Sequence, residues 1–347
     1  MNANEKYINY CIELAKLGAG NVAPNPMVGC VIVCDGKIIG EGYHQKHGKA
    51  HAEVNAINSV ANPALLKKST LFVTLEPCSH FGLTPPCSDL IIEKQIPKVV
   101  IGIIDPFAEV AGKGVKKMQK AGIDIEVGIL EKECRELNKR FFTFHEKKRP
   151  HIILKWAQTL DGFIDIDRTK EEFGEPTWIT GNKALLRVHK MRAVEDAIFV
   201  GTKTAEKDNP ALTVRHCPGR NPIRIVLDNN LRLAKNLNLF DGIVKTIVFN
   251  SIKNKEIGNI IFMKIDFNTE IIPQILHKLY NQKILSVIIE GGKQLLESFI
   301  KSNYWDEACL FIGNKHFLGG IKAPQISGNI VSTEILDSDK LIVYKNQ

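Results

Sequence analysis

One histidine, two cysteines and one glutamate in this sequence have types and spacings that suit catalysis by zinc. His51 precedes Glu53 by two residues, and Cys78 and Cys87 each directly follow a proline. One imidazole and two thiolates supply three zinc ligands and leave the fourth tetrahedral position for water, as in a catalytic rather than a structural zinc site. Zinc lowers the pKa of its bound water to about 7, so hydroxide is available at neutral pH. We therefore expect His51, Cys78 and Cys87 to bind Zn²⁺.

The glutamate of this group is expected to transfer protons. A His-x-Glu sequence followed by Pro-Cys is typical of zinc-dependent base deaminases, in which the carboxylate does not bind the metal. Glu53, at the start of a predicted helix, is the expected catalytic residue. Cys87 follows Pro85-Pro86 at another predicted helix N-terminus, where the helix dipole favours a thiolate. Unrelated buried cysteines or a four-ligand zinc knuckle would explain the same residues without catalysis.

A second candidate site lies at Glu290-Gly291-Gly292, which follows a β-branched stretch and precedes a predicted helix. Glycine lets the backbone approach a ligand closely, and the N–H groups of a helix N-terminus can bind a phosphate. A tight strand–helix turn alone would give the same pattern. The stretch lacks a Gly-x-Gly-x-x-Gly fingerprint, which disfavours a doubly wound Rossmann domain.

The composition is that of an ordinary globular protein. The 347 residues are 44% hydrophobic and 24% charged, with a formal net charge of +8, which excludes a disordered, collagenous or coiled-coil chain as the main class. No apolar run reaches the about 18 residues that span a bilayer, and the N-terminus shows no signal-peptide pattern. We therefore expect a cytoplasmic protein with no membrane partner. The positive charge is spread thinly, which favours anionic small molecules over nucleic acid.

Alternating helices and strands must position these residues. In the first half, helices are predicted at 4–18, 51–60, 87–94, 113–121 and 130–144, and strands at 27–34, 37–42, 70–75, 98–104 and 124–127. In the second half, strands are predicted at 151–156, 197–201, 223–227, 246–250, 260–265, 284–290 and 341–344, and helices at 182–192, 270–281 and 293–302. Asp35-Gly36 predicts a hairpin turn. The alternation predicts α/β layers in both halves, with a boundary near the charged stretch before Pro150, between domains 1–146 and 150–347.

The motifs around these residues resemble one family along nearly the whole chain. In the first half they are Pro24–Gly29, Gly40–His44, His51–Val54, Thr74–His80, Thr84–Cys87, Asp105 and Val110–Gly114. In the second half they are Arg149-Pro150, Leu154–Gly162, Trp178–Gly181, Val188–Ala193, Asp208–Arg215, Ile289–Gly292 and Leu318–Gly320. Together they resemble the bifunctional deaminase–reductases of bacterial riboflavin biosynthesis. The resemblance implies a cytidine-deaminase-like three-layer α/β/α domain followed by a dihydrofolate-reductase-like α/β domain.

The resemblance also implies a substrate and two reactions. Zinc-dependent deamination of 2,5-diamino-6-ribosylamino-4(3H)-pyrimidinone 5′-phosphate would be followed by NADPH reduction of its ribosyl group, giving 5-amino-6-ribitylamino-uracil 5′-phosphate. The expected partner is thus a small molecule rather than nucleic acid, and we expect a homo-oligomer, a dimer or a tetramer. Two other hypotheses stay open: a nucleic-acid (tRNA) base deaminase with an accessory domain, and a non-catalytic zinc scaffold with four protein ligands.

The resemblance assigns roles to further residues. In the deaminase half, the implied substrate contacts are Asn25, His44 and His80. In the reductase half, the implied substrate contacts are Arg192, Leu212, Arg215 and Glu290, and the implied cofactor contacts are Gln158, Trp178, Thr204, Asp208, Gly291, Gly292, Lys293, Gln294, Leu295, Leu296 and Glu297. The two arginines have the fork geometry that suits a clamp on the 5′-phosphate.

The sequence departs from the family pattern at a few positions. Leu83 stands where a basic residue is usual, and Phe107 stands where a polar residue is usual. The charged segment Asp165–Glu175 is longer than in many members, and Pro176 replaces a usual serine. Because the zinc residues are complete, these departures predict weaker substrate binding rather than lost chemistry.

Overall fold

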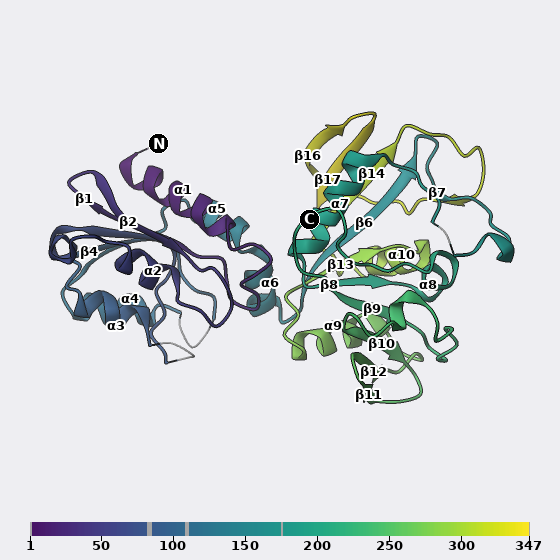
Figure 1. Cartoon of the computed structure of the whole chain (residues 1–347), viewed down its shortest axis with the longest axis horizontal. Helices are drawn as coiled ribbons and strands as arrows, with labels where there is room; N and C mark the ends of the chain where they lie inside the picture. The colour runs from purple at the N-terminus through teal and green to yellow at the C-terminus, as the bar shows by residue number, and fades with distance from the viewer. Residues whose placement is uncertain (1, 82–84, 108–110, 175, 347) are drawn as a thin grey trace. The chain divides into compact units, whose positions relative to one another are not determined.

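The computed structural model describes residues 2–81, 85–107, 111–174 and 176–346. The chain divides into two compact units, Met1–Lys148 and Arg149–Gln347. Each unit is built on its own sheet (Figure 1). Among the described residues, no helix combines the length and the apolar character needed to cross a membrane.

The sheet of the first unit has the strand order β2-β1-β3-β4-β5. These strands are β1 (Gly29–Cys34), β2 (Lys37–Tyr43), β3 (Thr70–Leu75), β4 (Lys98–Ile103) and β5 (Asp124–Val127). β1 is antiparallel to β2 and β3, whereas β3, β4 and β5 are parallel. Asp35 and Gly36 have φ of +49° and +74°, the left-handed conformations that a two-residue hairpin turn requires, so the predicted hairpin is confirmed.

Helices cover both faces of this sheet. The helices are α1 (Ala3–Lys16), α2 (Ala52–Asn58), α3 (Cys87–Glu93), α4 (Lys113–Lys120), α5 (Glu131–Leu137) and α6 (Lys139–Lys147), with a 3₁₀ turn at Pro63–Lys68. The alternation of β1 divides the core, because Cys30 and Ile32 join the cluster that includes α2 and α3, while Val31 and Val33 join the cluster that includes α1 and α5. The predicted three-layer α/β/α arrangement is confirmed.

The single helix predicted over 130–144 is wrong. Two helices, α5 and α6, meet at Asn138, whose φ of −108° and ψ of 24° depart from helical values. Its side-chain oxygen accepts from the backbone N–H of Met27 at 2.8 Å, and its amide donates to the Met27 carbonyl at 2.8 Å. The break therefore fastens this end of the unit to the segment that enters β1.

The sheet of the second unit, as described, has the order β11-β12-β10-β9-β8-β13-β6-β14-β17-β16. The strands are β6 (His151–Thr159), β8 (Ala197–Val200), β9 (Ile223–Leu227), β10 (Thr246–Asn250), β11 (Lys255–Ile257), β12 (Ile260–Lys264), β13 (Ser286–Glu290), β14 (Glu307–Gly313), β16 (Asn329–Leu336) and β17 (Asp339–Lys345). The run from β12 to β14 is parallel, and antiparallel pairs close both edges. A small separate sheet pairs β7 (Phe163–Asp165) with β15 (Ile321–Lys322).

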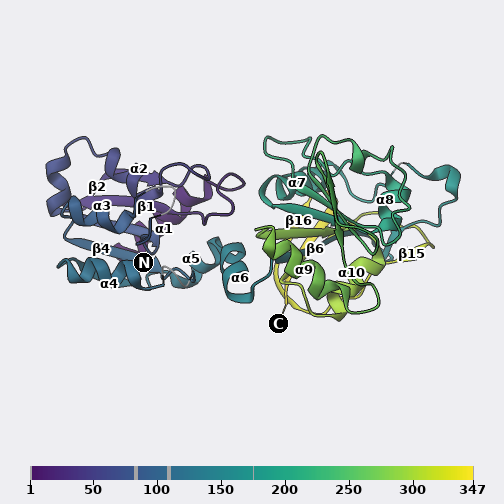
Figure 2. The ribbon, with the colours of Figure 1, turned by 90° about the horizontal axis from the view of Figure 1, so that it is seen from below.

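Two layers of helix enclose the second sheet (Figure 2). They are α7 (Asn182–Val194), α8 (Thr202–Asp208), α9 (Ile271–Asn281) and α10 (Lys293–Lys301), with 3₁₀ turns at Lys170–Glu172 and Asn238–Phe240. Residues of α9 and α10 join the largest core cluster, in which Phe199 and Phe299 pack at right angles. α7 and α8 contribute to two smaller clusters. The sequence analysis did not predict β7, β11, β14, β15, β16 or α8.

Candidate active sites

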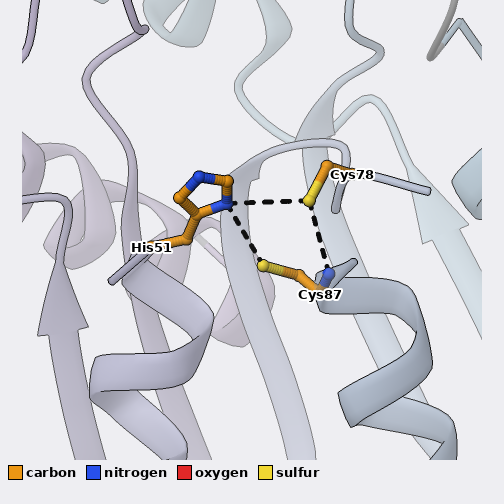
Figure 3. A group of neighbouring side chains, drawn as sticks. All are labelled: His51, Cys78 and Cys87. Carbon is orange, nitrogen blue, oxygen red and sulfur yellow. Dashed lines mark hydrogen bonds between the residues drawn. The ribbon is translucent and has the colours of Figure 1, made fainter. Parts of the chain in front are cut away.

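The predicted zinc ligands converge in the first unit. His51 caps α2, Cys78 follows β3, and Cys87 is the first residue of α3. His51 Nδ1 lies 3.6 Å from Cys78 Sγ and 3.4 Å from Cys87 Sγ, and the ligand atoms of all three residues lie within 4.8 Å of one another (Figure 3). Zn–N bonds of about 2.0–2.1 Å and Zn–S bonds of about 2.3 Å at tetrahedral angles place nitrogen about 3.6 Å from sulfur. The three residues therefore fit a zinc ion.

The helix α3 acts on Cys78 more directly than on Cys87. The backbone N–H of Cys87 donates to Cys78 Sγ at 3.3 Å, so an amide of the helix N-terminus stabilises negative charge on the other cysteine. Hydrogen bonds from the Cys87 and His51 side chains lower the pKa of Cys78. The N-terminus of α3 thus favours a thiolate, as expected, but the recipient is Cys78.

Glu53 lies beside the ligand group without belonging to it. It is in the first turn of α2 and is only 4% exposed. Burial, and then the charge of Cys78, raise the pKa of Glu53 to about 7. Among the described residues, the metal-binding group consists of His51, Cys78 and Cys87, and three protein ligands are typical of a catalytic zinc site.

Two of the implied substrate contacts lie next to this group. The rings of His44 and His51 meet edge-on at 5.4 Å. His44 Nδ1 lies 3.1 Å from the Ala50 carbonyl, so it carries the proton, and His44 Nε2 accepts from the Asn25 amide at 3.2 Å. Burial lowers the pKa of His44, which keeps the ring neutral. The Asn25 amide is thereby oriented.

His80 lies further out. It is exposed, and its ring lies 6.3 Å from that of Phe107, which also packs 5.1 Å from His145. Phe107, which stands where a polar residue is usual, thus contacts both His80 and His145 of α6. Leu83, the other departure noted in this half, lies outside the described residues.

Sequence reasoning missed the role of Glu76. This buried carboxylate accepts from the backbone N–H groups of Gly112, Gly114 and Val115 at 2.8, 2.9 and 3.2 Å, and from that of Asp105 at 3.4 Å. It caps α4 and fixes the segment that leads to Cys78. A Cβ at Gly114 would lie 2.2 Å from the Pro77 carbonyl, so that position requires glycine. The sequence did contain a signal for this contact: a glutamate directly before Pro77-Cys78, and the later Gly112-Lys113-Gly114.

In the second unit, Glu290 lies between two cations. Its carboxylate accepts from Lys155 Nζ at 2.7 Å and from Arg192 Nη2 at 2.7 Å. Parallel pairing of β6 and β13 aligns Lys155 with Glu290, which ends β13. Burial alone would raise the pKa of Glu290, but Arg192 and Lys155 lower it to about 2. The implied contacts Glu290 and Arg192 are thus brought together, with Lys155 as a third member.

The other two implied substrate contacts follow α8 in an irregular loop. Arg215 is exposed and its backbone N–H donates to His189 Nδ1 at 3.1 Å, while Arg192 Nη1 reaches the Thr213 carbonyl at 3.4 Å. Leu212 is buried in the core and has a φ of +53°. The guanidinium of Arg192 already donates to Glu290. If both arginines bind the phosphate, the N–H groups of Arg192 must therefore be divided between Glu290 and the phosphate.

Three implied cofactor contacts form a tight cradle. Gly291 and Gly292 have φ of +105° and +77°, and a Cβ at either position would lie 3.0 Å from the Thr204 side chain. Only glycine suits such a conformation with so little space. This close approach of backbone to α8 is a cradle of the kind that fits a phosphate-bearing cofactor.

The remaining implied cofactor contacts are more scattered. Gln158 accepts from Trp156 Nε1 at 3.0 Å, and Trp178 is 53% exposed. Asp208 pairs with Arg168 of the long charged segment, whose guanidinium also binds Asp165 at 2.8 Å. On α10, Gln294 is exposed, Lys293 and Glu297 approach to 3.7 Å, and Leu295 and Leu296 belong to the core.

Both units match known protein families. Residues 1–103 match the model described as the cytidine and deoxycytidylate deaminase zinc-binding region, and residues 150–340 match the RibD C-terminal domain. A riboflavin biosynthesis protein RibD of Aquifex aeolicus is 42% identical over 322 residues, covering 90% of this chain and 87% of that protein. The chain belongs to the RibD family. Another RibD, from Bacillus amyloliquefaciens, is 39% identical and covers 93% of this chain and 87% of its own length.

Solved structures of RibD proteins agree over the full length. A diaminohydroxyphosphoribosylaminopyrimidine deaminase/5-amino-6-(5-phosphoribosylamino)uracil reductase from Thermotoga maritima is 38% identical, with a TM-score of 0.89 and 99% of each chain covered. A RibD from Acinetobacter baumannii is 31% identical, with a TM-score of 0.89 and the same coverage. RibD membership confirms the predicted fold, a cytidine-deaminase-like domain followed by a dihydrofolate-reductase-like domain, and the predicted class, a bifunctional deaminase–reductase of riboflavin biosynthesis.

Proposed function

We propose that this chain deaminates 2,5-diamino-6-ribosylamino-4(3H)-pyrimidinone 5′-phosphate in its first unit and reduces the ribosyl group of the product with NADPH in its second unit, giving 5-amino-6-ribitylamino-uracil 5′-phosphate. The observation that carries the proposal is the His51, Cys78 and Cys87 group with buried Glu53 beside it. The names of the RibD relatives and the cradle of the second unit support the same assignment.

In the deaminase step, zinc would supply a nucleophile derived from water at neutral pH. His51, Cys78 and Cys87 would hold the ion, and the Cys87 N–H stabilises the thiolate of Cys78 for that purpose. Glu53 accepts a proton from the attacking water and delivers it to the departing amino group, which leaves as ammonia. Asn25, held by His44, orients the edge of the pyrimidine ring.

In the reductase step, NADPH would supply a hydride to C1′ of the ribosyl group. The C1′–O4′ bond breaks, and the ring oxygen takes up a proton. Glu290 is ionised and therefore only accepts hydrogen bonds, so it can orient sugar hydroxyls. Lys155 is the member of this cluster that can give up a proton, since arginine keeps its charge in proteins. The Gly291 and Gly292 backbone and Thr204 form the floor of the cofactor site in this proposal.

The other assignments of the proposal concern the setting of the enzyme. We place it in the cytoplasm, as a homo-oligomer that is a dimer or a tetramer, and both assignments rest on the resemblance to the RibD family. Sedimentation velocity of the zinc-loaded protein tests the second assignment. A single monomeric species at micromolar concentration would contradict it.

A turnover assay followed by mass spectrometry tests the two reactions. Zinc-loaded protein is given the pyrimidine ribosylamino phosphate, with and without NADPH. Deamination alone without NADPH, and deamination followed by reduction with it, are the expected results. Deamination that stops there in the presence of NADPH would remove the reductase assignment, and the absence of deamination with zinc bound would remove the deaminase assignment.

A further inference from the structure

His189 is a fully buried histidine of the second unit to which no role has yet been given. It lies on α7, three residues before Arg192, on the same side of the helix. Its Nδ1 accepts the backbone N–H of Arg215 at 3.1 Å. Because Nδ1 accepts, the ring is neutral and carries its proton on Nε2, an atom with no hydrogen-bond partner among the described residues.

The surroundings of His189 keep its ring neutral. Burial lowers the pKa of His189 to about 4, and the charges of Arg192, His216 and Arg215 act in the same direction, against the charge of Glu290. The His216 ring packs edge-on against it at 4.5 Å. His189 Nδ1 therefore remains able to accept the Arg215 N–H throughout the pH range in which an enzyme of this kind works.

Hydrogen bonds hold both ends of the loop that His189 anchors. At its start, Asn209 Oδ1 accepts from the backbone N–H of Asn238 at 2.7 Å, and near its end, Val214 N–H donates to Asn221 Oδ1 at 2.8 Å. Between them Leu212 adopts a left-handed backbone conformation, with φ of +53°, which is strained for a non-glycine residue. A loop strained in this way needs anchors to keep one conformation.

The contacts of α7 with this loop determine where Arg215 lies. Arg192 contacts the same loop at the Thr213 carbonyl, so α7 holds it at two neighbouring points, one through His189 and one through Arg192. We propose that His189 is a positioning residue of the reductase site, whose imidazole fixes the Arg215 backbone so that the guanidinium of Arg215 meets the 5′-phosphate of the substrate beside Arg192. The inference rests on the proposed reductase function.

Four variants of the full-length protein test this inference: His189→Leu, His189→Asn, Arg215→Ala and the double variant His189→Leu/Arg215→Ala. Asparagine places an acceptor oxygen near the position of Nδ1, whereas leucine fills the space without one. Reductase KM and kcat are measured with the deaminated ribosylamino phosphate at saturating NADPH. Deaminase turnover of the same preparations reports that the first unit is folded and loaded with zinc, and the reductase kcat reports that the second unit is folded.

Loss of the acceptor should act on binding rather than on the chemical step. We expect His189→Leu to raise the reductase KM about tenfold, the effect of one lost hydrogen bond, with kcat changed by less than about threefold. His189→Asn should recover most of this loss. Since His189 acts through Arg215, the double variant should have the KM of Arg215→Ala alone.

The possible failures have different meanings. An unchanged KM in His189→Leu, or KM effects that multiply in the double variant, would overturn the inference while leaving the reductase function standing. An unchanged KM in Arg215→Ala would overturn the inference together with the proposed phosphate contact. Absence of reduction by the unaltered protein would instead be a failure of the proposed function itself.

Discussion

The functional side chains of the two units are prepared in different ways. In the first unit, the donor atoms of His51, Cys78 and Cys87 face one another at the separations that a zinc ion requires. In the second unit, Glu290 already pairs with Lys155 and Arg192, and Asp208 pairs with Arg168. The deaminase residues are thus arranged to receive a cation, whereas the charged side chains of the reductase site are paired with one another.

This difference has consequences for binding. A site whose ligand atoms already converge can bind a cation with little rearrangement. A site whose charges are paired with one another must exchange internal hydrogen bonds for those of the ligand. We therefore expect substitutions in the deaminase site to act mainly on chemistry and metal content, and those in the reductase site to act on binding and on stability.

The largest effect is expected for Glu53→Gln. Glutamine keeps the size and loses the transferable proton, so deamination should fall about 10²–10⁴-fold, while zinc content and NADPH-dependent reduction of the deaminated substrate stay near those of the unaltered protein. Turnover assays and metal analysis on one preparation measure all three. Retention of more than about a tenth of the deaminase rate would argue against proton transfer by Glu53.

A smaller effect on catalysis, accompanied by an effect on stability, is expected for Glu290→Gln. The variant leaves Lys155 and Arg192 without a counter-ion, so reduction should fall about a hundredfold and deamination should be unaffected. The Glu290 carboxylate has a pKa of about 2 against an ordinary value of 4.5, which contributes about 3 kcal/mol to stability above the unfolded pKa. This contribution is lost as the pH falls through the folded pKa. Urea unfolding of both proteins at pH 7 and at pH 3 should show their difference in unfolding free energy shrinking at the lower pH. An equal difference at both values would contradict the ion-pair account.

A weaker effect, on metal affinity, is expected for Glu76→Gln. The amide nitrogen would face either the N–H group of Gly112 or the N–H groups of Gly114 and Val115, which disturbs the segment before Cys78. Zinc affinity should fall about 10–100-fold, and excess zinc should restore deamination. Competition with a chromophoric chelator measures the affinity. Unchanged affinity would show that Glu76 supports α4 alone.

The smallest effect is expected for Asn25→Ala. Loss of one amide contact to the ring should raise the deaminase KM about tenfold, with zinc content and reductase kinetics unchanged. Asn25→Asp serves as the matched control because it keeps an acceptor and loses the donor to His44. A KM equal to that of the unaltered protein in both variants would remove Asn25 from the substrate site.

The deaminase site could be predicted from the sequence because its residues carry their signal locally. His51 and Glu53 are neighbours on one turn, and each cysteine stands beside a proline at the end of an element. The turn at Asp35-Gly36 could be predicted for the same reason. Residue type and short spacing were sufficient there, because strand and helix periodicity determine which side chains lie together.

The rest depended on partners far apart in the chain. Asn138 breaks a helix by bonding Met27, 111 residues away, and Glu290 pairs with Arg192 and Lys155, 98 and 135 residues away. The pairing of Arg168 with Asp208 joins the long charged segment to α8. Such hydrogen bonds depend on how whole helices and strands pack, so no local sequence pattern predicts them. The family resemblance implied roles for Arg192, Asp208 and Glu290, but it did not predict which side chains they pair with.

Removal of zinc tests most directly the claim that the two units carry separate chemistries. Chelation of the metal, followed by separate assays of deamination and of reduction of the deaminated substrate, should lower the first activity about a hundredfold or more and leave the second unchanged. Added zinc should then restore deamination. Loss of both activities with the fold retained, or loss of neither, would contradict the assignment of one reaction to each unit.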